Sequence, residues 1–280
     1  MVCKRVMDIE NVFVPRIPTG IPELDWLYDG DSVKNGLGLP NWGLPDGKIS
    51  LWSGVKGIGK SRATIEIARC ATSLQWRKVL YFQGETDLSS FRHWVGEDGN
   101  PISCLFSVSD SFDLDEQISD IKKTLPNIVI VDSINRIEEF GSGVKSNIKK
   151  IHDAYMDAIR YVQSKGDMIH IIFLCQINQD GSVKGSTDLG HLVDTEASFI
   201  PWTDPAMIGP MPGHFLLKLG DKHRYGRTGD RFVIYWEHLE KKASCVSSER
   251  KKDAKWVKVH ESIQKKSIKK RSLLNKFFNI

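Results

Sequence analysis

Long apolar runs are missing from this 280-residue chain, and their absence excludes a large class of proteins. The longest such run, residues 169–175, has the length of a buried strand. A helix that crosses a bilayer needs about 18 or more apolar residues. The N-terminus, Met-Val-Cys-Lys-Arg-Val, also lacks the apolar core of a secretory signal. We therefore expect no membrane partner.

Cysteine is scarce as well. The five cysteines lie far apart, and none forms a C-x-x-C pair. This spacing argues against a structural zinc site and against a disulfide framework. A reducing cytoplasm is therefore the expected location. The content of 40% hydrophobic and 26% charged residues is typical of a globular protein, and the length suits one sizeable domain with an appendage.

The net charge of +4 conceals an uneven distribution. Residues 250–280 contain eleven Lys and Arg residues and two acids, a net charge of +9, whereas residues 1–249 sum to −5. We predict a lead-in segment over residues 1–14, a core over 15–240 and a basic tail over 241–280.

Short β-branched runs alternate with helical stretches after residue 16, which is typical of a parallel sheet covered by helices. We predict an α/β fold with a mostly parallel, twisted sheet flanked by helices. The predicted strands are 49–53, 79–82, 105–108, 128–131 and 169–175. The predicted helices are 61–74, 88–95, 115–124 and 146–165. Residues 215–219 and 231–236 are expected to pair antiparallel at the sheet edge, and the pattern is expected to stop after Leu239.

Residues 54–61 read Gly-Val-Lys-Gly-Ile-Gly-Lys-Ser, a G-x-x-x-x-G-K-[ST] phosphate-binding loop between a predicted strand and a predicted helix. The glycines let backbone N–H groups converge on phosphates, Lys60 supplies a point charge to the β and γ phosphates, and the Ser61 hydroxyl suits Mg²⁺. The helix that follows would point its positive end at the same phosphates. The predicted ATP-binding residues are Gly54, Val55, Lys56, Gly57, Ile58, Gly59, Lys60, Ser61 and Arg62. A glycine-rich turn that matches by accident is the alternative.

Polar side chains follow three other predicted strands. Asp132 ends the run 128–131 and fits a second Mg²⁺ ligand, although Asp also follows strands as a turn or cap residue. Glu85 would face the γ-phosphate and activate the attacking water, or it is an exposed loop acid. Gln176 would hydrogen-bond the γ-phosphate and couple it to the polar loop 178–186.

Taken together, these motifs make the chain similar to the RecA superfamily, and most closely to the ATPase core of the RadA/Sms DNA-repair proteins. The match covers residues 16 to 236. The matching motifs, in chain order, are Arg16-Ile-Pro-Thr-Gly-Ile-Pro-Glu-Leu-Asp25, Gly57-Ile-Gly-Lys-Ser61, Gly84-Glu85, Asp132-Ser-Ile-Asn135, Asp180-Gly-Ser-Val-Lys-Gly185, Leu189-Gly-His-Leu-Val-Asp194 and Lys222-His-Arg-Tyr-Gly226. The last resembles the family's Lys-Asn-Arg-Phe-Gly signature.

The resemblance implies a RecA-like core that hydrolyses ATP with Mg²⁺, binds single-stranded DNA and forms a ring or filament with ATP at subunit interfaces. Glu85 then activates water, while Lys222 and Arg224 reach the phosphates of a neighbouring subunit. Without the family context, residues 222–226 are a solvated hairpin tip. Recombination or replication proteins are implied as further partners.

Several features depart from the family pattern. The four-cysteine zinc module has no counterpart, a basic tail stands where the family has a protease-like domain, and the connection 29–47 is longer. Gln176 is more typical of RecA itself. These departures leave open the partners, the oligomer type and any branch-migration activity.

Basic residues outside the nucleotide motifs are candidates for DNA contacts. The predicted DNA-binding residues are Lys145, Lys184, Lys251 and Lys252. The tail also repeats lysines at helical spacing, at 265, 266, 269 and 270, and ends in an apolar group that includes Phe277 and Phe278. Three roles are open for this tail. It binds DNA phosphates, it docks on a protein surface through its apolar group, or it is a solvated chain end without a further role.

We predict a DNA-stimulated ATP hydrolase that acts in homologous recombination, repair or replication, by branch migration or strand exchange. One alternative is a replicative-helicase-like ring motor. Another, from a different class, is a nucleotide-dependent scaffold or clock-type signalling ATPase, whose turnover would not need DNA.

Overall fold

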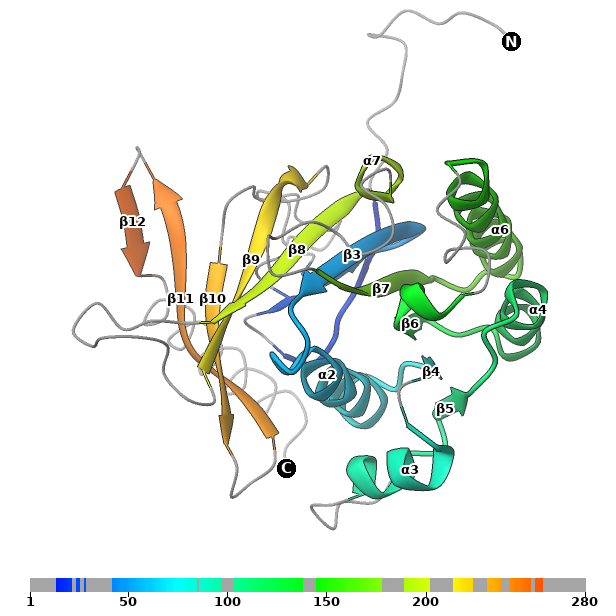
Figure 1. Ribbon diagram of the computed structural model, residues 1–280, viewed down its shortest axis with the longest axis horizontal. Coiled ribbons are helices and arrows are strands. Elements are labelled where there is room, and N and C mark those ends of the chain that lie inside the picture. Colours follow the sequence, from blue (N-terminus) through cyan, green and yellow to red (C-terminus); the bar gives the residue numbers. More distant parts are fainter. Residues whose placement is uncertain are drawn as a thin grey trace, which may run out of the picture.

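The computed structural model describes residues 14–21, 24–25, 28, 42–84, 86–96, 103–137, 145–177, 189–201, 214–223, 231–237, 242–252 and 255–258. A ten-stranded sheet forms the body of this part of the chain, in the order β12-β11-β10-β9-β8-β3-β7-β6-β4-β5 (Figure 1). A small antiparallel pair, β1 (Arg16–Ile17) with β2 (Leu44–Pro45), forms a separate two-stranded sheet.

Six neighbouring strands of the sheet run parallel. They are β8 (Thr195–Pro201), β3 (Lys48–Gly54), β7 (His170–Gln176), β6 (Ile128–Asp132), β4 (Val79–Gln83) and β5 (Phe106–Ser109). Beyond β8 the sheet continues antiparallel. The added strands are β9 (His214–His223), β10 (Arg231–Glu237), β11 (Lys242–Lys252) and β12 (Lys255–Lys258).

Helices cover both faces of the parallel part (Figure 1). One face carries α2 (Lys60–Leu74) and α3 (Leu88–Gly96), and the other carries α4 (Leu114–Thr124) and α6 (Lys145–Ser164). The short η2 (Ile134–Arg136) follows β6, and α7 (Leu189–Leu192) precedes β8. The predicted RecA-like α/β architecture is therefore confirmed.

Strand alternation explains why the sheet needs both helical layers. Along β6, Ile128 and Ile130 join the core under α2 and α3, whereas Val129 and Val131 join the core under α4 and α6. All four side chains are fully buried. A strand buried on both faces reads as a continuous apolar run, which is why the sequence shows one here.

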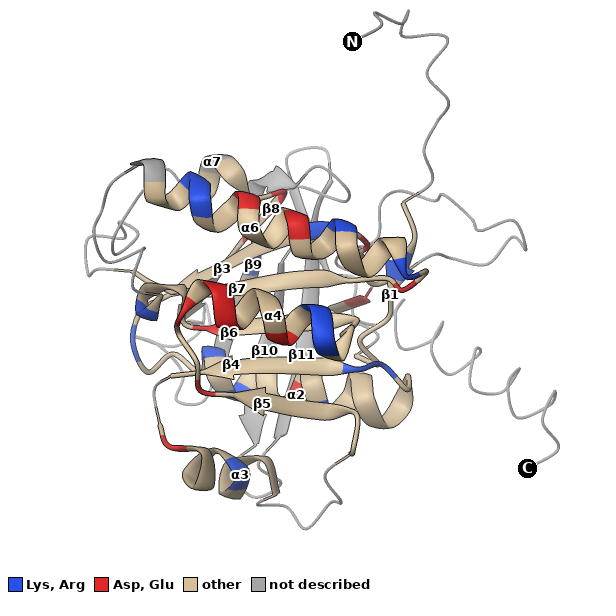
Figure 2. Ribbon diagram, turned by 90° about the vertical axis from the view of Figure 1, so that its right-hand side faces the viewer, with Lys and Arg blue, Asp and Glu red and all other residues tan. Residues whose placement is uncertain are grey.

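The helices carry clear boundary signals. The Asp113 carboxylate caps α4 by accepting a hydrogen bond from the Glu116 N–H at 2.9 Å, and Leu125 ends the helix with a left-handed φ of 49°. Acidic residues stand at the start of α4 and basic residues at its end, matching the helix dipole (Figure 2). None of the described helices combines the length and the apolar character needed to cross a bilayer.

The opening motif of the family resemblance has a structural task. The buried Asp25 carboxylate accepts hydrogen bonds from the Thr19 N–H at 2.7 Å and the Thr19 hydroxyl at 2.8 Å. Gly20, with a φ of +86°, lies so close to α2 that an added Cβ would be 3.0 Å from the carbonyl oxygen of Cys70. The motif therefore anchors the start of the described chain against the phosphate-loop helix.

The secondary-structure predictions are confirmed to within one residue for the five strands and four helices of the parallel core. The predicted antiparallel pairing of 215–219 with 231–236 is also confirmed, since β9 pairs with β10. Its place at the sheet edge was wrong, and so was the expected end of the pattern after Leu239, because β11 and β12 extend the sheet. The sequence analysis also missed β8, whose buried residues Thr195 and Ala197 are small.

β11 was missed for a physical reason. Its sequence, Lys-Ala-Ser-Cys-Val-Ser-Ser-Glu-Arg-Lys-Lys, lacks a regular apolar alternation, and backbone pairing with β10 defines it as a strand. The division of the chain at residue 240 remains a prediction.

Candidate nucleotide site

Four adjacent parallel strands bring their carboxyl ends to one edge of the sheet. The register pairs Gly54 of β3 with Gln176 of β7, and Asp132 of β6 with Gln83 of β4. In open α/β sheets, ligands bind at this edge. The phosphate loop, Asp132 and Gln176, predicted separately from the sequence, therefore meet in one place.

The phosphate loop connects β3 directly to α2. Gly57 and Gly59 have φ values of 79° and 106°, which only glycine adopts without strain. Gly59 stands at the N-cap of α2 without a side-chain cap, so the first backbone N–H groups of the helix face the loop. Lys60 and Ser61 are the first two residues of α2. This is the strand–loop–helix geometry of an anion site.

Lys60 is held inside the loop. Its ammonium group donates hydrogen bonds to the carbonyl oxygens of Gly54 at 2.8 Å and Val55 at 3.0 Å, and the residue is only 7% exposed. Lys56, in the same loop, is exposed. The loop thus contains one buried cation with a fixed position and one that faces solvent.

A buried hydrogen-bond chain joins Asp132 to α2. The Tyr81 hydroxyl donates to the Asp132 carboxylate at 2.8 Å and lies 3.0 Å from the Thr64 hydroxyl. Thr64 in turn donates to the carbonyl oxygen of Lys60 at 3.1 Å. Tyr81, Thr64 and Asp132 are all buried. This chain fixes the carboxylate relative to the first turn of the phosphate-loop helix.

Sequence reasoning missed Tyr81 because a tyrosine inside an apolar strand is indistinguishable from a core residue. Its neighbour Thr64 lies seventeen residues away in the sequence. The sequence offers one signal for Thr64. It lies four residues after Lys60, so the two side chains are on one face of the predicted helix.

Gln176 is positioned through its backbone. The Gln176 N–H donates to the Asn135 side-chain oxygen at 2.9 Å, and the N–H of Ile177 donates to the Gly54 carbonyl at 3.3 Å. Asn135 was part of the second nucleotide motif, but its role as a brace for β7 was not predicted. Burial raises the pKa of the adjacent Cys175 thiol to about 11. That thiol is therefore neutral beside Lys60.

Glu85 itself lies outside the described residues, but Gly84 before it is firmly held. The Gly84 N–H donates to the Asp132 carbonyl at 3.0 Å, and its carbonyl accepts from the Arg136 guanidinium at 2.7 Å. An added Cβ at Gly84 would lie 2.1 Å from the Phe112 ring. Gly84, the residue before Glu85, is therefore in contact with β6, with η2 and with the segment between β5 and α4.

The other predicted site residues fall in several places. Arg62 lies over the Trp94 ring, 5.1 Å from its centroid, so it also contacts α3. Lys145 begins α6, and Lys222 lies near the end of β9. Lys251 and Lys252 end β11 rather than standing in a free tail. The predictions for Lys184 and Arg224 lie outside the described residues.

Mg²⁺ fits the oxygen donors that this edge provides. Ser61, which carries a hydroxyl, is the second residue of α2, and Asp132, which carries a carboxylate, is the last residue of β6. No cluster of three or more His, Cys, Asp or Glu residues suited to a metal ion occurs in the described ranges. A cation held by one carboxylate, one hydroxyl and substrate phosphates is the usual mode for Mg²⁺, which rarely uses an all-protein cage.

Comparisons with known proteins agree with this geometry. No protein-family model matches the sequence. The chain is 27% identical over 234 residues to the DNA repair protein RadA of Mycolicibacterium smegmatis, covering 82% of this chain and 45% of that protein. It is 24% identical over 230 residues to RadA of Bacillus subtilis, again covering 82% and 45%. The chain thus spans under half the length of these relatives.

A solved structure shows the same fold. The KaiC-like protein PH0186 of Pyrococcus horikoshii superimposes with a TM-score of 0.59 at 14% identity, covering 83% of this chain and 99% of that one. In sequence and in fold, the chain is similar to ATPases of the RecA superfamily. Within that superfamily of ATPases it is close to RadA in sequence.

Proposed function

We propose that this RecA-superfamily protein binds and hydrolyses ATP and that single-stranded DNA stimulates the hydrolysis. The observation that carries the proposal is the convergence of the buried Lys60 and Asp132 with the half-buried Gln176 at the carboxyl edge of four parallel strands. The relatives named as DNA repair proteins support the DNA-directed role.

In this proposal the residues divide the work at the edge. Lys60 exchanges its carbonyl partners for the β and γ phosphates, and residues 54–59 offer backbone N–H groups. Ser61 and Asp132 hold Mg²⁺, which supplies charge neutralisation for the leaving phosphate. Gln176, braced by Asn135, reports the γ-phosphate to the loop that follows β7.

Glu85 is proposed as the residue that activates water. The position of Gly84 supports this role, because the Gly84 N–H donates to the Asp132 carbonyl and the start of Glu85 is therefore tied to the strand that carries Asp132. Glu85→Gln is expected to keep ATP binding and to lower turnover by ~10²-fold or more, the usual value of a positioned base. Turnover close to wild type would move this role to another residue.

Lys222 and Arg224 are proposed to act on the phosphates of a neighbouring subunit in a ring or filament. The sheet register supports an action across an interface. His223 pairs with Thr195, which pairs with Ser50, four residues before Gly54 on β3. At about 3.3 Å per residue, the end of β9 lies about 13 Å along the strand direction from its own phosphate loop.

DNA is proposed to contact Lys184 in the loop after β7, Lys145 at the start of α6, and the basic C-terminal region. α6 connects two parallel strands, so its first residue stands at the nucleotide edge. Lys251 and Lys252 belong to the β11–β12 hairpin, in which Lys252 pairs with Lys255. We further propose a role in homologous recombination, repair or replication, by branch migration or strand exchange, in the cytoplasm.

The direct test measures ATP turnover of the full-length protein with and without single-stranded DNA. We expect at least about fivefold stimulation, the lower end of typical coupling between two sites. A second measurement follows DNA affinity against salt. Replacing Lys265, Lys266, Lys269 and Lys270 by Gln should reduce the slope of log K against log salt by up to about 2.8, at about 0.7 per contact.

The control for the second measurement is Lys122→Gln with Lys123→Gln, two exposed lysines of α4. This variant is expected to leave the slope unchanged. Turnover that is independent of DNA, in a protein without DNA affinity, would favour the scaffold or signalling alternative. The KaiC-like fold neighbour is compatible with that alternative. ATP-driven movement along single-stranded DNA would favour the helicase-like ring motor.

A further inference from the structure

An apolar pocket of about 330 Å³ lies between α3 and the edge strand β5. Its lining residues are Leu88, Phe91, Arg92, Val95, Phe106 and Val108. Leu88 and Val108 are each 38% exposed, which is unusual for side chains of this type. Among the described strands β5 pairs with β4 alone, so one side of the pocket is open at the sheet edge.

The pocket floor touches the nucleotide site through aromatic rings. The Phe91 ring lies 5.0 Å from the Tyr81 ring and the Phe106 ring lies 6.3 Å from it, centroid to centroid. Tyr81 is the residue that donates its hydroxyl hydrogen to Asp132. Leu88, at the pocket rim, is also only three residues after Glu85. A group bound in this pocket would therefore stabilise both Tyr81 and the start of α3.

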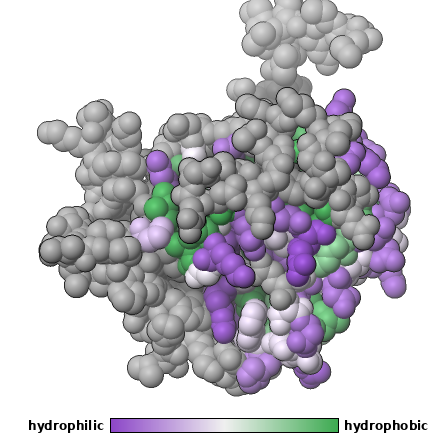
Figure 3. All heavy atoms as spheres, in the orientation of Figure 1, coloured by the Kyte–Doolittle hydropathy of each residue, from purple (hydrophilic) through white to green (hydrophobic). Residues whose placement is uncertain are grey.

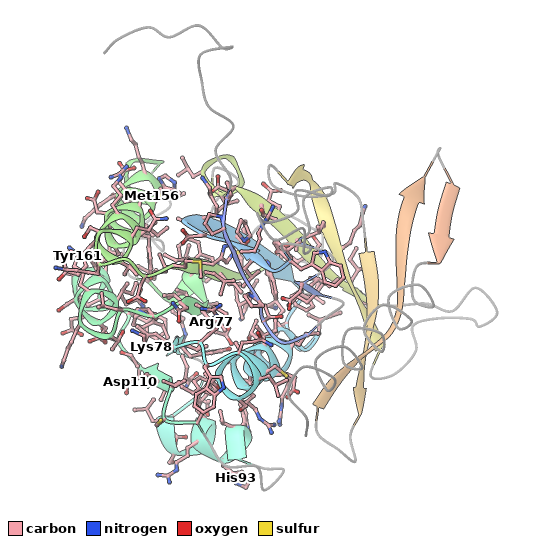
Figure 4. The ribbon with its side chains drawn as sticks, turned by 180° about the vertical axis from the view of Figure 1, so that it is seen from behind. Arg77, Lys78, His93, Asp110, Met156 and Tyr161 are labelled. Carbon is pink, nitrogen blue, oxygen red and sulfur yellow. The ribbon has the colours of Figure 1, made fainter. Side chains whose placement is uncertain are left out.

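Acidic residues surround the apolar lining. Asp87 precedes α3 and Asp110 follows β5, and both are exposed. Figure 4 labels Asp110. Arg92 lines the pocket and His93 lies next to it on α3, so the described residues at the rim are two carboxylates, one guanidinium and one imidazole. Elsewhere, the described face in Figure 3 is largely hydrophilic, with hydrophobic side chains in small groups.

We propose that the apolar end of the chain's own basic tail, residues 273–280, docks in this pocket. This segment contains Leu273, Leu274, Phe277 and Phe278, and it follows the run Lys-Lys-Ser-Ile-Lys-Lys-Arg of residues 265–271. Its composition complements the site in both respects, since apolar groups meet an apolar pocket and positive charges meet an acidic rim. A bound phenylalanine would extend the stack of Phe91, Phe106 and Tyr81.

The connection is long enough for docking within one molecule. β12 and β5 are the two edges of the ten-stranded sheet, nine strand spacings of about 4.8 Å apart, or about 43 Å measured across the strands. Residues 259–272 can span up to about 46 Å at 3.3 Å per residue. The basic residues 265–271 lie outside the docked portion and remain able to contact phosphates.

The experiment replaces Phe277 with the photoreactive p-benzoylphenylalanine in the full-length protein and maps the cross-linked peptides by mass spectrometry. We expect adducts within residues 88–95 and 106–108, in species with the mass of a monomer. Val108→Lys, which places a charge at the exposed rim, should lower the yield of these adducts at least fivefold. Ser107→Lys is the matched control, because it lies next on the strand, is exposed and points to the opposite face.

Adducts spread over other surfaces, or an equal yield in both lysine variants, would overturn the proposal. Adducts of dimer mass would assign the pocket to the tail of a second copy and would overturn docking within one chain. A further consequence rests on the proposed function. Phe277→Ser with Phe278→Ser should lower basal ATP turnover at least threefold, because α3 loses its support. Cross-linking does not depend on turnover, so the two proposals fail separately.

Discussion

Lys60 and Asp132 are both almost fully buried, at 7% and 4% exposure, and hydrogen bonds hold each of them in place. A buried charge is costly unless it is paired or hydrogen-bonded. For Lys60 the partners are backbone carbonyls of its own loop, and for Asp132 the partner is a tyrosine on the neighbouring strand. Single side chains are therefore the scale at which the site is tested most directly.

Lys60→Ala should leave the fold intact and abolish ATP turnover, because the phosphates lose their fixed cation. The measurements are steady-state turnover and the circular dichroism spectrum of the purified variant. Lys122→Ala is the control, since Lys122 is an exposed lysine of α4 outside the phosphate loop. Hydrolysis near the wild-type rate in folded Lys60→Ala would remove the enzymatic proposal.

Tyr81→Phe removes only the hydroxyl that joins Asp132 to Thr64. We expect a loss of about 1.5–3 kcal/mol in the free energy of unfolding, the usual value of a hydrogen bond to a charged group. We also expect a higher Mg²⁺ concentration for half-maximal turnover, because the carboxylate loses its alignment. Denaturant unfolding measures the first quantity, and turnover at increasing Mg²⁺ concentration measures the second.

Tyr155→Phe provides a matched comparison. Tyr155 is fully buried, and its hydroxyl donates to the neutral side chain of Gln117, in the layer of α4 and α6. That variant should lose stability without a change in Mg²⁺ dependence. An identical Mg²⁺ response in the two variants would show that Tyr81 is merely a core residue.

At the scale of single elements, β7 delivers two kinds of side chain to the nucleotide edge. Gln176 ends the strand next to Gly54, and Cys175 precedes it with its side chain buried. Burial raises the pKa of the Cys175 thiol from its ordinary value of 9.0 to about 11 and that of Cys70 on α2 to about 12. The reactive form of a thiol is the thiolate, so both should be inert at neutral pH.

Alkylation by iodoacetamide at about pH 8 should therefore modify Cys104, which is exposed, well before Cys70 or Cys175. Mass spectrometry of digested peptides gives the order. Rapid labelling of Cys175 in the folded protein would contradict its burial in β7.

The raised pKa of Cys175 also predicts how the free energy of unfolding depends on pH. The folded state holds the Cys175 proton between pH 9 and about 11, where the unfolded state releases it. This contribution to the unfolding free energy is complete below pH 9 and is lost as pH rises toward 11. The urea midpoint of the wild type should therefore fall more steeply over this range than that of Cys175→Ala.

At the scale of the whole molecule, the sheet holds the phosphate loop and Lys222 at different ends of its strands. The phosphate loop lies at the carboxyl end of β3, whereas the register places Lys222 near the opposite end of the strands. In the proposed head-to-tail assembly, the phosphate loop of one subunit would face the end of β9 of its neighbour.

Mixing Lys222→Ala subunits with Lys60→Ala subunits should restore part of the ATPase activity. At some mixed interfaces one subunit supplies an intact loop and its neighbour an intact Lys222. Turnover measured across mixing ratios should pass through a maximum, while each variant alone stays inactive. Absence of recovery at every ratio, with co-assembly shown by pull-down, would place Lys222 in its own site or in none.

The extent of the sheet also changes how the tail must be studied. Removing everything after residue 249 would cut β11, which pairs with β10 through Glu249 itself. Substitutions within residues 259–280 avoid this damage and separate the electrostatic role of the lysines from the docking role of Phe277 and Phe278.

The amino-acid sequence by itself determined the features that depend on consecutive residues. The phosphate loop at 54–61 is local chemistry, since glycines, a lysine and a serine in fixed order need only a strand before and a helix after. Asp132 and Gln176 were predictable because each ends an apolar run, and parallel strands bring their carboxyl ends to one edge. The core elements followed from apolar periodicity.

Only the tertiary structure decided the features that join distant residues. Tyr81 contacts Asp132 fifty-one positions away, and Arg136 holds Gly84 from fifty-two positions away. β11 lacks a regular apolar alternation and is a strand because β10 supplies its hydrogen-bond partners. The pocket between the consecutive elements α3 and β5 likewise depends on how the two pack at the edge of the sheet. Such contacts depend on which segments the fold places side by side, and no local run of residues encodes that placement.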